Sequence, residues 1–198
     1  MANSLRERRR LLLRDEILQA ARLLILEKGY AAMSMEDLAA HVGISKPTLY
    51  SHFAAKEDLV VAAFISEVEK LFAFVESETE HLSPRQRLMF LLSVMMKQHA
   101  DEATMAARPA TPELFHILCA HEQSFKYMQR VEALIASLFE EAIACGEVDA
   151  RLNPKVMVRA FFSIVHSARI SQFFPIDVNT EVLEKTLTTF FERGIIAQ

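Results

Sequence analysis

The sequence predicts an all-helical protein of about nine helices. Apolar residues recur at spacings of three and four along the 198 residues, without the sustained alternation of half-buried strands. The four glycines and six prolines fall where a helix would begin or end. We expect a three-helix domain over residues 1–55 and a larger helical domain over residues 56–198.

The first helix is expected to end at Gly29, because glycine readily takes the left-handed conformation past a helix end. Its inner face is predicted to carry Leu13, Ile17, Ala21 and Leu24. Several arginines precede or open this helix. These arginines either lie along DNA phosphates or in a minor groove, or they form a solvated chain end. They are Arg6, Arg8, Arg9, Arg10 and Arg14.

Two further helix starts lie within one short stretch. At the first, Ser34 is the expected N-cap, and Asp37 can complete a capping box. Met33 and Leu38 occupy the two positions of a hydrophobic staple. This helix is expected to end at Gly43.

The second start follows at once. Ser45 is the expected N-cap, and Pro47 is tolerated in the first turn, where no intrahelical N–H group is needed. Ile44 and Leu49 form another staple. Two short helices joined by a tight turn with glycine are typical of a helix-turn-helix.

The second of these helices has a polar outer face. Leu49 and Phe53 are four residues apart and are expected to face inward. No acidic residue lies between His41 and Lys56 in the sequence. The remaining groups are of the kinds that hydrogen-bond phosphates and base edges: Ser45, Lys46, Thr48, Tyr50, Ser51 and His52. An ordinary solvated helix is the alternative, but the caps, staples and acid-free face together favour DNA binding.

These motifs resemble the N-terminal domain of the TetR family of bacterial transcriptional repressors, from roughly Leu11 to Val60. The string TLYxHFxxKE, from Thr48 to Glu57, is among the most specific marks of that family. The other matching positions are Gly29, Ser34, Leu38-Ala39 and Val42-Gly43-Ile44-Ser45. Pro47 and His41 depart from the residues usual in the family, so the base preference cannot be taken from a relative.

The resemblance implies that Lys56 opens the helix linking the two domains and contacts phosphate there. The pattern and the resemblance together predict these DNA-binding residues: Ser34, Ser45, Lys46, Pro47, Thr48, Tyr50, Ser51, His52 and Lys56.

The remaining helices are expected between proline and glycine breakers. The fourth runs from Lys56 to about Glu80, and the fifth from Ser83-Pro84 to before Pro109. Two helices, one short and one longer, fill the stretch from Thr111-Pro112 to Gly146 and meet near residues 120–124. The eighth is expected from Asn153-Pro154 to Phe173-Phe174-Pro175, and the ninth from Val178 to Arg193.

The charge of the chain is divided unevenly. Residues 1–56 carry nine Lys/Arg and six Asp/Glu, whereas residues 57–198 carry thirteen and twenty, so only the N-terminal end suits phosphates. No apolar run is long enough for a membrane span, and two cysteines without a secretory signal favour a reducing cytoplasm. His116, Cys119 and His121 do not have the spacing of a metal site. No cofactor motif or catalytic motif is present, so we expect no cofactor, no metal and no enzyme.

The last two expected helices carry more aromatic residues than one inner stripe needs, which favours a homodimer interface there. The alternative is that all these rings pack within one chain. The resemblance implies the same interface and an effector pocket in the C-terminal domain. Apolar residues with a few polar groups could line that pocket and would suit a small hydrophobic effector. The candidates are Met95, Gln98, His99, Phe115, Phe125, Tyr127, Phe162 and His166.

The sequence therefore favours a dimeric DNA-binding transcriptional regulator of operator DNA. Repression, with release by an effector, is an expectation from the resemblance. The alternatives are a constitutive DNA-binding protein without a ligand, and a helical small-molecule carrier or enzyme. The sequence does not identify the effector, the operator or the regulated genes.

Overall fold

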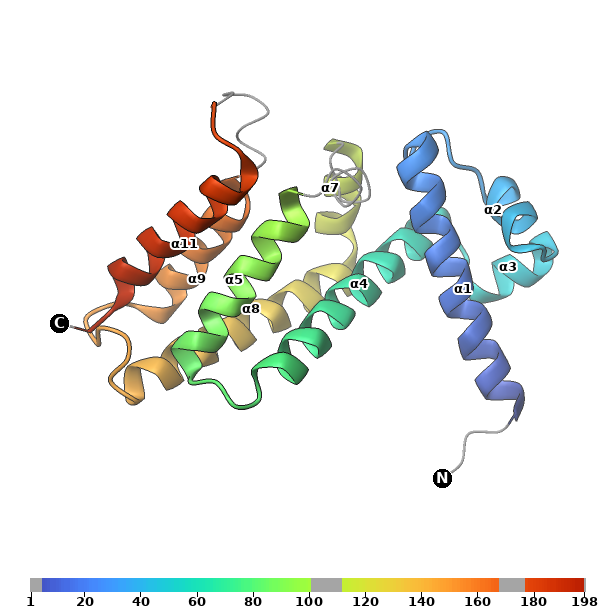
Figure 1. Ribbon diagram of the computed structural model, residues 1–198. Coiled ribbons are helices and arrows are strands. Elements are labelled where there is room, and N and C mark those ends of the chain that lie inside the picture. The colour runs from blue at the N-terminus through green and yellow to red at the C-terminus, as the bar shows by residue number, and fades with distance from the viewer. Residues whose placement is uncertain (1–4, 101–111, 168–176, 198) are drawn as a thin grey trace. The chain divides into compact units, whose positions relative to one another are not determined.

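The computed structural model describes residues 5–100, 112–167 and 177–197. Over these residues the chain forms nine α-helices and no strand, which confirms the all-helical prediction (Figure 1). The helices are α1 (Leu5–Lys28), α2 (Met35–Val42), α3 (Lys46–His52), α4 (Lys56–Thr79), α5 (Pro84–Ala100), α7 (Pro112–Ala120), α8 (Glu122–Ala144), α9 (Pro154–Val165) and α11 (Thr180–Ile195).

The chain divides into two compact units. Residues 1–69 and 106–125 form the N-terminal unit, and residues 70–105 and 126–198 form the C-terminal unit. Two helices, α4 and α8, begin in the N-terminal unit and continue into the C-terminal unit. The domain boundary between residues 55 and 56 stays a prediction.

The local signals of the helix-turn-helix are confirmed. The Ser34 hydroxyl accepts the Asp37 N–H at 3.0 Å, and the Asp37 carboxylate accepts the Ser34 N–H at 3.4 Å, which completes the capping box. Gly43 takes φ 76°, a left-handed conformation that a side chain would strain. The Ser45 hydroxyl caps α3 by accepting the Thr48 N–H at 3.3 Å.

One hydrophobic core holds the N-terminal unit together, with α2 and α3 packed beside α1 (Figure 1). Ile17 and Ala21 of α1 are fully buried, as the helical spacing predicted. Leu38 of α2 and Leu49 of α3 belong to the same core and are also fully buried. Leu114 of α7 joins this core although it is distant in sequence.

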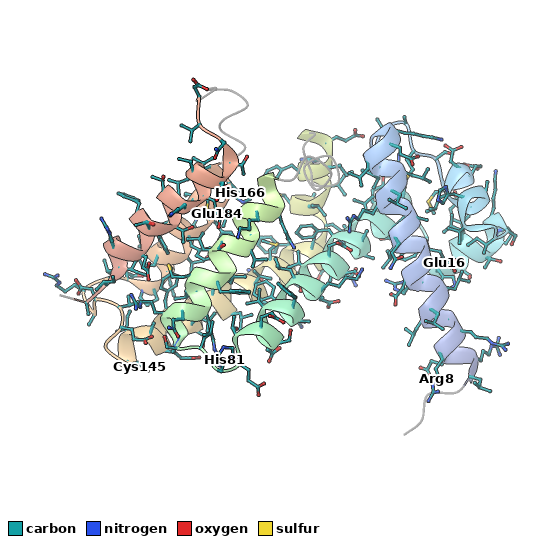
Figure 2. All side chains as sticks on the ribbon, viewed as in Figure 1. Arg8, Glu16, His81, Cys145, His166 and Glu184 are labelled. Carbon is teal, nitrogen blue, oxygen red and sulfur yellow. The ribbon has the colours of Figure 1, made fainter. Side chains whose placement is uncertain are left out.

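In the C-terminal unit, α5 packs against α9 and α11. The Phe191 ring meets the rings of Phe139 and Phe161 edge to face, each at a centroid distance of 6.2 Å. Between α5 and α11 the Glu184 carboxylate, labelled in Figure 2, accepts the Ser93 hydroxyl at 2.5 Å and lies 3.6 Å from the Lys97 ammonium.

The predicted end of the eighth helix is wrong. Helix α9 ends at Val165, and His166 after it lies in a turn with φ −85° and ψ −2°. Phe173 and Phe174 lie outside the described residues. The expected end of the fifth helix, before Pro109, lies outside the described residues. The other helix starts and ends lie within a few residues of the expected positions.

Replacing Ser34 with alanine should lower the free energy of unfolding by about 1 kcal/mol, because the orphan N–H group at the start of α2 loses its acceptor. Ser51→Ala is the matched control, since it removes the same hydroxyl from an exposed site inside α3. Urea unfolding followed by circular dichroism measures both variants. Equal stability of the two variants would show that the capping box contributes nothing.

Candidate nucleic-acid interface

Helix α3 has one buried face and one polar face, as predicted. Leu49 and, at the end of the helix, Phe53 are buried. Lys46, Pro47 and Tyr50 are exposed, and Tyr50 keeps 46% of its surface accessible. The seven residues of α3 therefore present a cation, a proline ring and a phenol outward from a fixed core.

The three hydroxyls of this face are tied into α3 itself. Ser45 and Thr48 share a hydrogen bond of 2.8 Å between their hydroxyl oxygens, and the Ser51 hydroxyl donates to the Thr48 carbonyl at 2.7 Å. A hydroxyl has one donor and two acceptor positions, so each can still bond one further group. Ser34, in contrast, is already used in the capping box of α2.

Lys46 is paired with an acidic residue that the sequence pattern did not associate with this face. Its ammonium lies 2.5 Å from the Glu36 carboxylate of α2, and both side chains are about half exposed. The hydrogen bond from Lys46 lowers the pKa of Glu36, with smaller contributions from its backbone hydrogen bond and the Lys46 charge. The stretch from His41 to Lys56 is free of acids in sequence, but folding brings Glu36 beside it.

Lys56 lies at the start of α4, where the resemblance places it, but its ammonium is anchored. It donates to the Tyr30 carbonyl at 2.5 Å and lies 4.0 Å from the centroid of the Tyr30 ring. Burial, followed by the charge of Glu57, raises the pKa of the Tyr30 hydroxyl to about 12. The ammonium has three N–H donors, so donors remain for a phosphate.

The opening arginines belong to helix α1, which begins at Leu5. Arg14 fixes α1 against the end of α3: its guanidinium lies 4.4 Å from the centroid of the Phe53 ring and 3.5 Å from the His52 carbonyl. Burial, together with the charges of Arg10 and Arg14, lowers the pKa of His52.

The arginines of α1 and the end of α3 enclose a basic hollow of about 660 Å³ that the sequence pattern did not predict. We call it the α1–α3 hollow. The sequence signal that could have found it is the helical spacing of arginines on α1. Its lining residues are Arg6, Glu7, Arg9, Arg10, Leu13, Ser51 and His52.

The predicted effector residues fall in both units, and a pocket that all of them line stays a prediction. Phe115 and Phe125 belong to the N-terminal unit and are more than half exposed. In the C-terminal unit Met95 is buried, and the Phe162 ring stacks on His166 with centroids 6.4 Å apart. Gln98 and Tyr127 are half-buried there, and the His99 side chain lies outside the described residues.

Within the described part of the chain, no three His, Cys, Asp or Glu residues are grouped so that they could hold a metal. The two cysteines, Cys119 and Cys145, are free thiols at the surface. None of the described helices combines the length and the apolar composition that crossing a membrane requires.

The model of the family described as bacterial regulatory proteins, tetR family, matches residues 17–63, from α1 into α4. The HTH-type transcriptional regulator AlkX of Mycobacterium tuberculosis is 26% identical over 200 residues, which cover 96% of this chain and 90% of that protein. This chain belongs to the TetR family. It is a DNA-binding transcriptional regulator, as its helix-turn-helix predicted.

Another relative is more similar in sequence to this TetR-family chain, but over less of its length. The HTH-type transcriptional activator FasR of Mycolicibacterium smegmatis is 36% identical over 76 residues, 38% of this chain and 35% of that protein. Among solved structures, FadR from Bacillus subtilis in complex with stearoyl-CoA has a TM-score of 0.72 at 18% identity, covering 91% of this chain and 98% of that one. That similarity supports the fold.

Replacing Glu36 with glutamine should tighten binding to duplex DNA by roughly threefold to tenfold, because the change removes a negative charge beside the DNA and releases Lys46 to contact it. The dependence of affinity on salt should also become steeper by about one ion. Glu76→Gln, an exposed residue of α4 in the C-terminal unit, is the control for net charge alone. Fluorescence anisotropy measures both. Equal changes in the two variants would contradict a role for the Glu36–Lys46 pair.

Proposed function

We propose that this regulator is a homodimeric repressor that leaves its operator when a small hydrophobic effector binds. The observation that carries the DNA-binding part is the orientation of α3. Its apolar residues are buried in the core of the N-terminal unit, and its polar residues face outward on a helix capped by Ser45. In a helix-turn-helix the second helix enters the major groove with its N-terminal residues on the base edges.

This geometry suggests a division of roles on α3. Lys46, Pro47 and Thr48 occupy the first turn and would contact base edges. Tyr50 and Lys56 would contact phosphates, the phenol through its exposed hydroxyl and the ammonium through donors that Tyr30 leaves open. Phosphate contacts position the protein, and base contacts give it specificity.

A physical link between α7 and the DNA-binding residues supports control by an effector. Leu114 is buried in the core that also holds Leu49. At the end of α7, His121 accepts the Gln123 N–H at Nδ1, so its Nε2 carries the proton and donates to the Asp58 carboxylate at 3.2 Å. The other oxygen of Asp58 accepts the Ala55 N–H at the start of α4.

The end of α7 therefore contacts the start of α4, the helix that follows α3. Helix α8 follows α7 and continues into the C-terminal unit. An effector that binds one arrangement of these helices better than another would shift the population that fits DNA. The structure of FadR with stearoyl-CoA shows that a protein of this fold is found with an acyl ligand, which supports a hydrophobic effector.

Exposed apolar residues on α11 support a homodimer. Val182 and Phe190 are eight residues apart, about two turns, so they lie on the same side of the helix. They are 48% and 72% exposed. A two-fold dimer would give the regulator two recognition helices for an inverted repeat. A filled C-terminal core without a ligand, and hence constitutive binding, is the competing function.

A gel-shift titration on the DNA upstream of the regulator's own gene tests the proposal. We expect a specific shift that at least one hydrophobic compound of a panel abolishes, because an effector must favour the state that does not fit DNA. Transcription in vitro from the same DNA distinguishes repression from activation, the activity in the name of FasR. A shift that no compound alters would favour the constitutive function, and no shift at all would remove the operator assignment for that DNA.

Replacing Phe190 with glutamate should dissociate the dimer at micromolar concentration, because two like charges would be buried in a two-fold contact. Leu23→Glu, at a half-exposed site on α1, controls for the same apolar-to-charge change elsewhere. Sedimentation velocity measures the mass of each variant. A wild-type protein that sediments only as the 22.5 kDa chain would contradict the dimer.

A further inference from the structure

The first turns of α1 carry three arginines on one side. Arg6, Arg9 and Arg10 follow the i, i+3, i+4 spacing that places side chains on one face of a helix. Arg8 points away from the side of α1 where α3 lies (Figure 2). The arginines of that one face line the α1–α3 hollow, whereas Arg8 does not.

This segment is held in place against the recognition helix. Leu13 packs on the core of the N-terminal unit, one turn after the arginines. Arg14 contacts both the ring of Phe53 and the carbonyl of His52, at the C-terminal end of α3. A cation at a helix C-terminus is also favoured by the helix dipole. The arginine face therefore has a fixed position relative to α3.

The hollow carries an excess of positive charge. Arg6, Arg9 and Arg10 form no ion pair with any residue in the described part of the chain, and Glu7 is the single carboxylate of the lining. From α3 the Ser51 hydroxyl and the His52 imidazole complete the wall. Guanidinium groups and an imidazole are donors that bind phosphate oxygens, whereas the single O–H of Ser51 already donates to the Thr48 carbonyl.

We propose that the α1–α3 hollow is a further phosphate-binding site, in addition to Tyr50 and Lys56. It binds the DNA backbone beside the groove that α3 reads, and His52 takes up a proton when the DNA binds. The proposal rests on the proposed DNA-binding function of α3. A DNA phosphate is the ligand because Ser51 and His52 belong to the recognition helix itself, so DNA on α3 passes next to the arginines of α1.

The charges around His52 explain the proton uptake. In the free protein, burial and the charges of Arg10 and Arg14 keep its pKa below the ordinary value. A bound phosphate offsets the arginine charges and accepts a hydrogen bond from the protonated imidazole, so the pKa of His52 rises in the complex. Binding then takes up a proton, and affinity increases as the pH falls through the raised pKa. Arg14 lies against the ring of Phe53, the residue after His52. The other charged groups of the hollow all belong to α1: Arg6, Glu7, Arg9 and Arg10.

Single arginine substitutions distinguish a defined phosphate-binding site from non-specific electrostatic attraction between the protein and DNA. Arg9→Gln and Arg10→Gln each remove one positive charge from the hollow, and Arg8→Gln removes the same charge from another face of the same helix. The probe is a fluorescent duplex of random sequence, titrated by anisotropy over a series of salt concentrations. We expect the two hollow variants to bind roughly threefold to tenfold more weakly and to lower the salt slope by about one ion each, with a smaller loss for Arg8→Gln.

The pH dependence provides an independent readout. Wild-type affinity should rise between pH 8 and pH 6, by at most about tenfold per pH unit for one proton, and His52→Gln should lose that rise. Equal losses of affinity in all three arginine variants would contradict the phosphate-binding site in the hollow. The wild-type pH dependence retained in His52→Gln would contradict it as well. Both results would leave the proposed DNA binding by α3 intact. A wild-type chain that binds no duplex at any salt concentration would instead overturn the proposed function.

Discussion

The recognition helix depends on burial. Helix α3 has only seven residues, and isolated helices of that length do not persist in water. It forms because Leu49 and Phe53 are buried in the core of the N-terminal unit and because Ser45 supplies an acceptor at its start. The core fixes the orientation of α3, and the polar side chains are those that this orientation leaves on its outer face. Substitutions that open the core should therefore act on DNA binding without touching DNA.

The same core extends to residues that are distant in sequence. Leu114 and Ile117 of α7 pack on it, and His121 bonds to the carboxylate that caps α4. A rearrangement of α7 would thus expose apolar surface in the core that holds α3. Because α8 follows α7 directly and continues into the C-terminal unit, the chain has a covalent route by which an event there could reach the recognition helix.

Local features were predictable from the sequence, and contacts between distant segments were not. The capping box of Ser34, the left-handed Gly43 and the inward Leu49 depend on neighbours within a few residues, so the pattern predicted them correctly. The Glu36–Lys46 pair, the placement of Lys56 on Tyr30 and the α1–α3 hollow require the helices to be packed first. The early end of α9 was missed because no glycine or proline marks it. The effector residues stay a prediction for the same reason, since a pocket is made by segments that the spacing does not bring together.

Selection from a library of random duplexes tests the central claim most directly, because it needs neither the operator nor the effector. Full-length protein would be incubated with the library, and the bound DNA would be recovered and sequenced over several rounds. Two α3 helices related by a two-fold axis should enrich an inverted repeat whose half-sites are centred about one helical turn, or a multiple of it, apart. A bound pool without any shared sequence, from protein that still binds DNA in a salt-dependent way, would contradict the assignment of α3 as a base-reading helix.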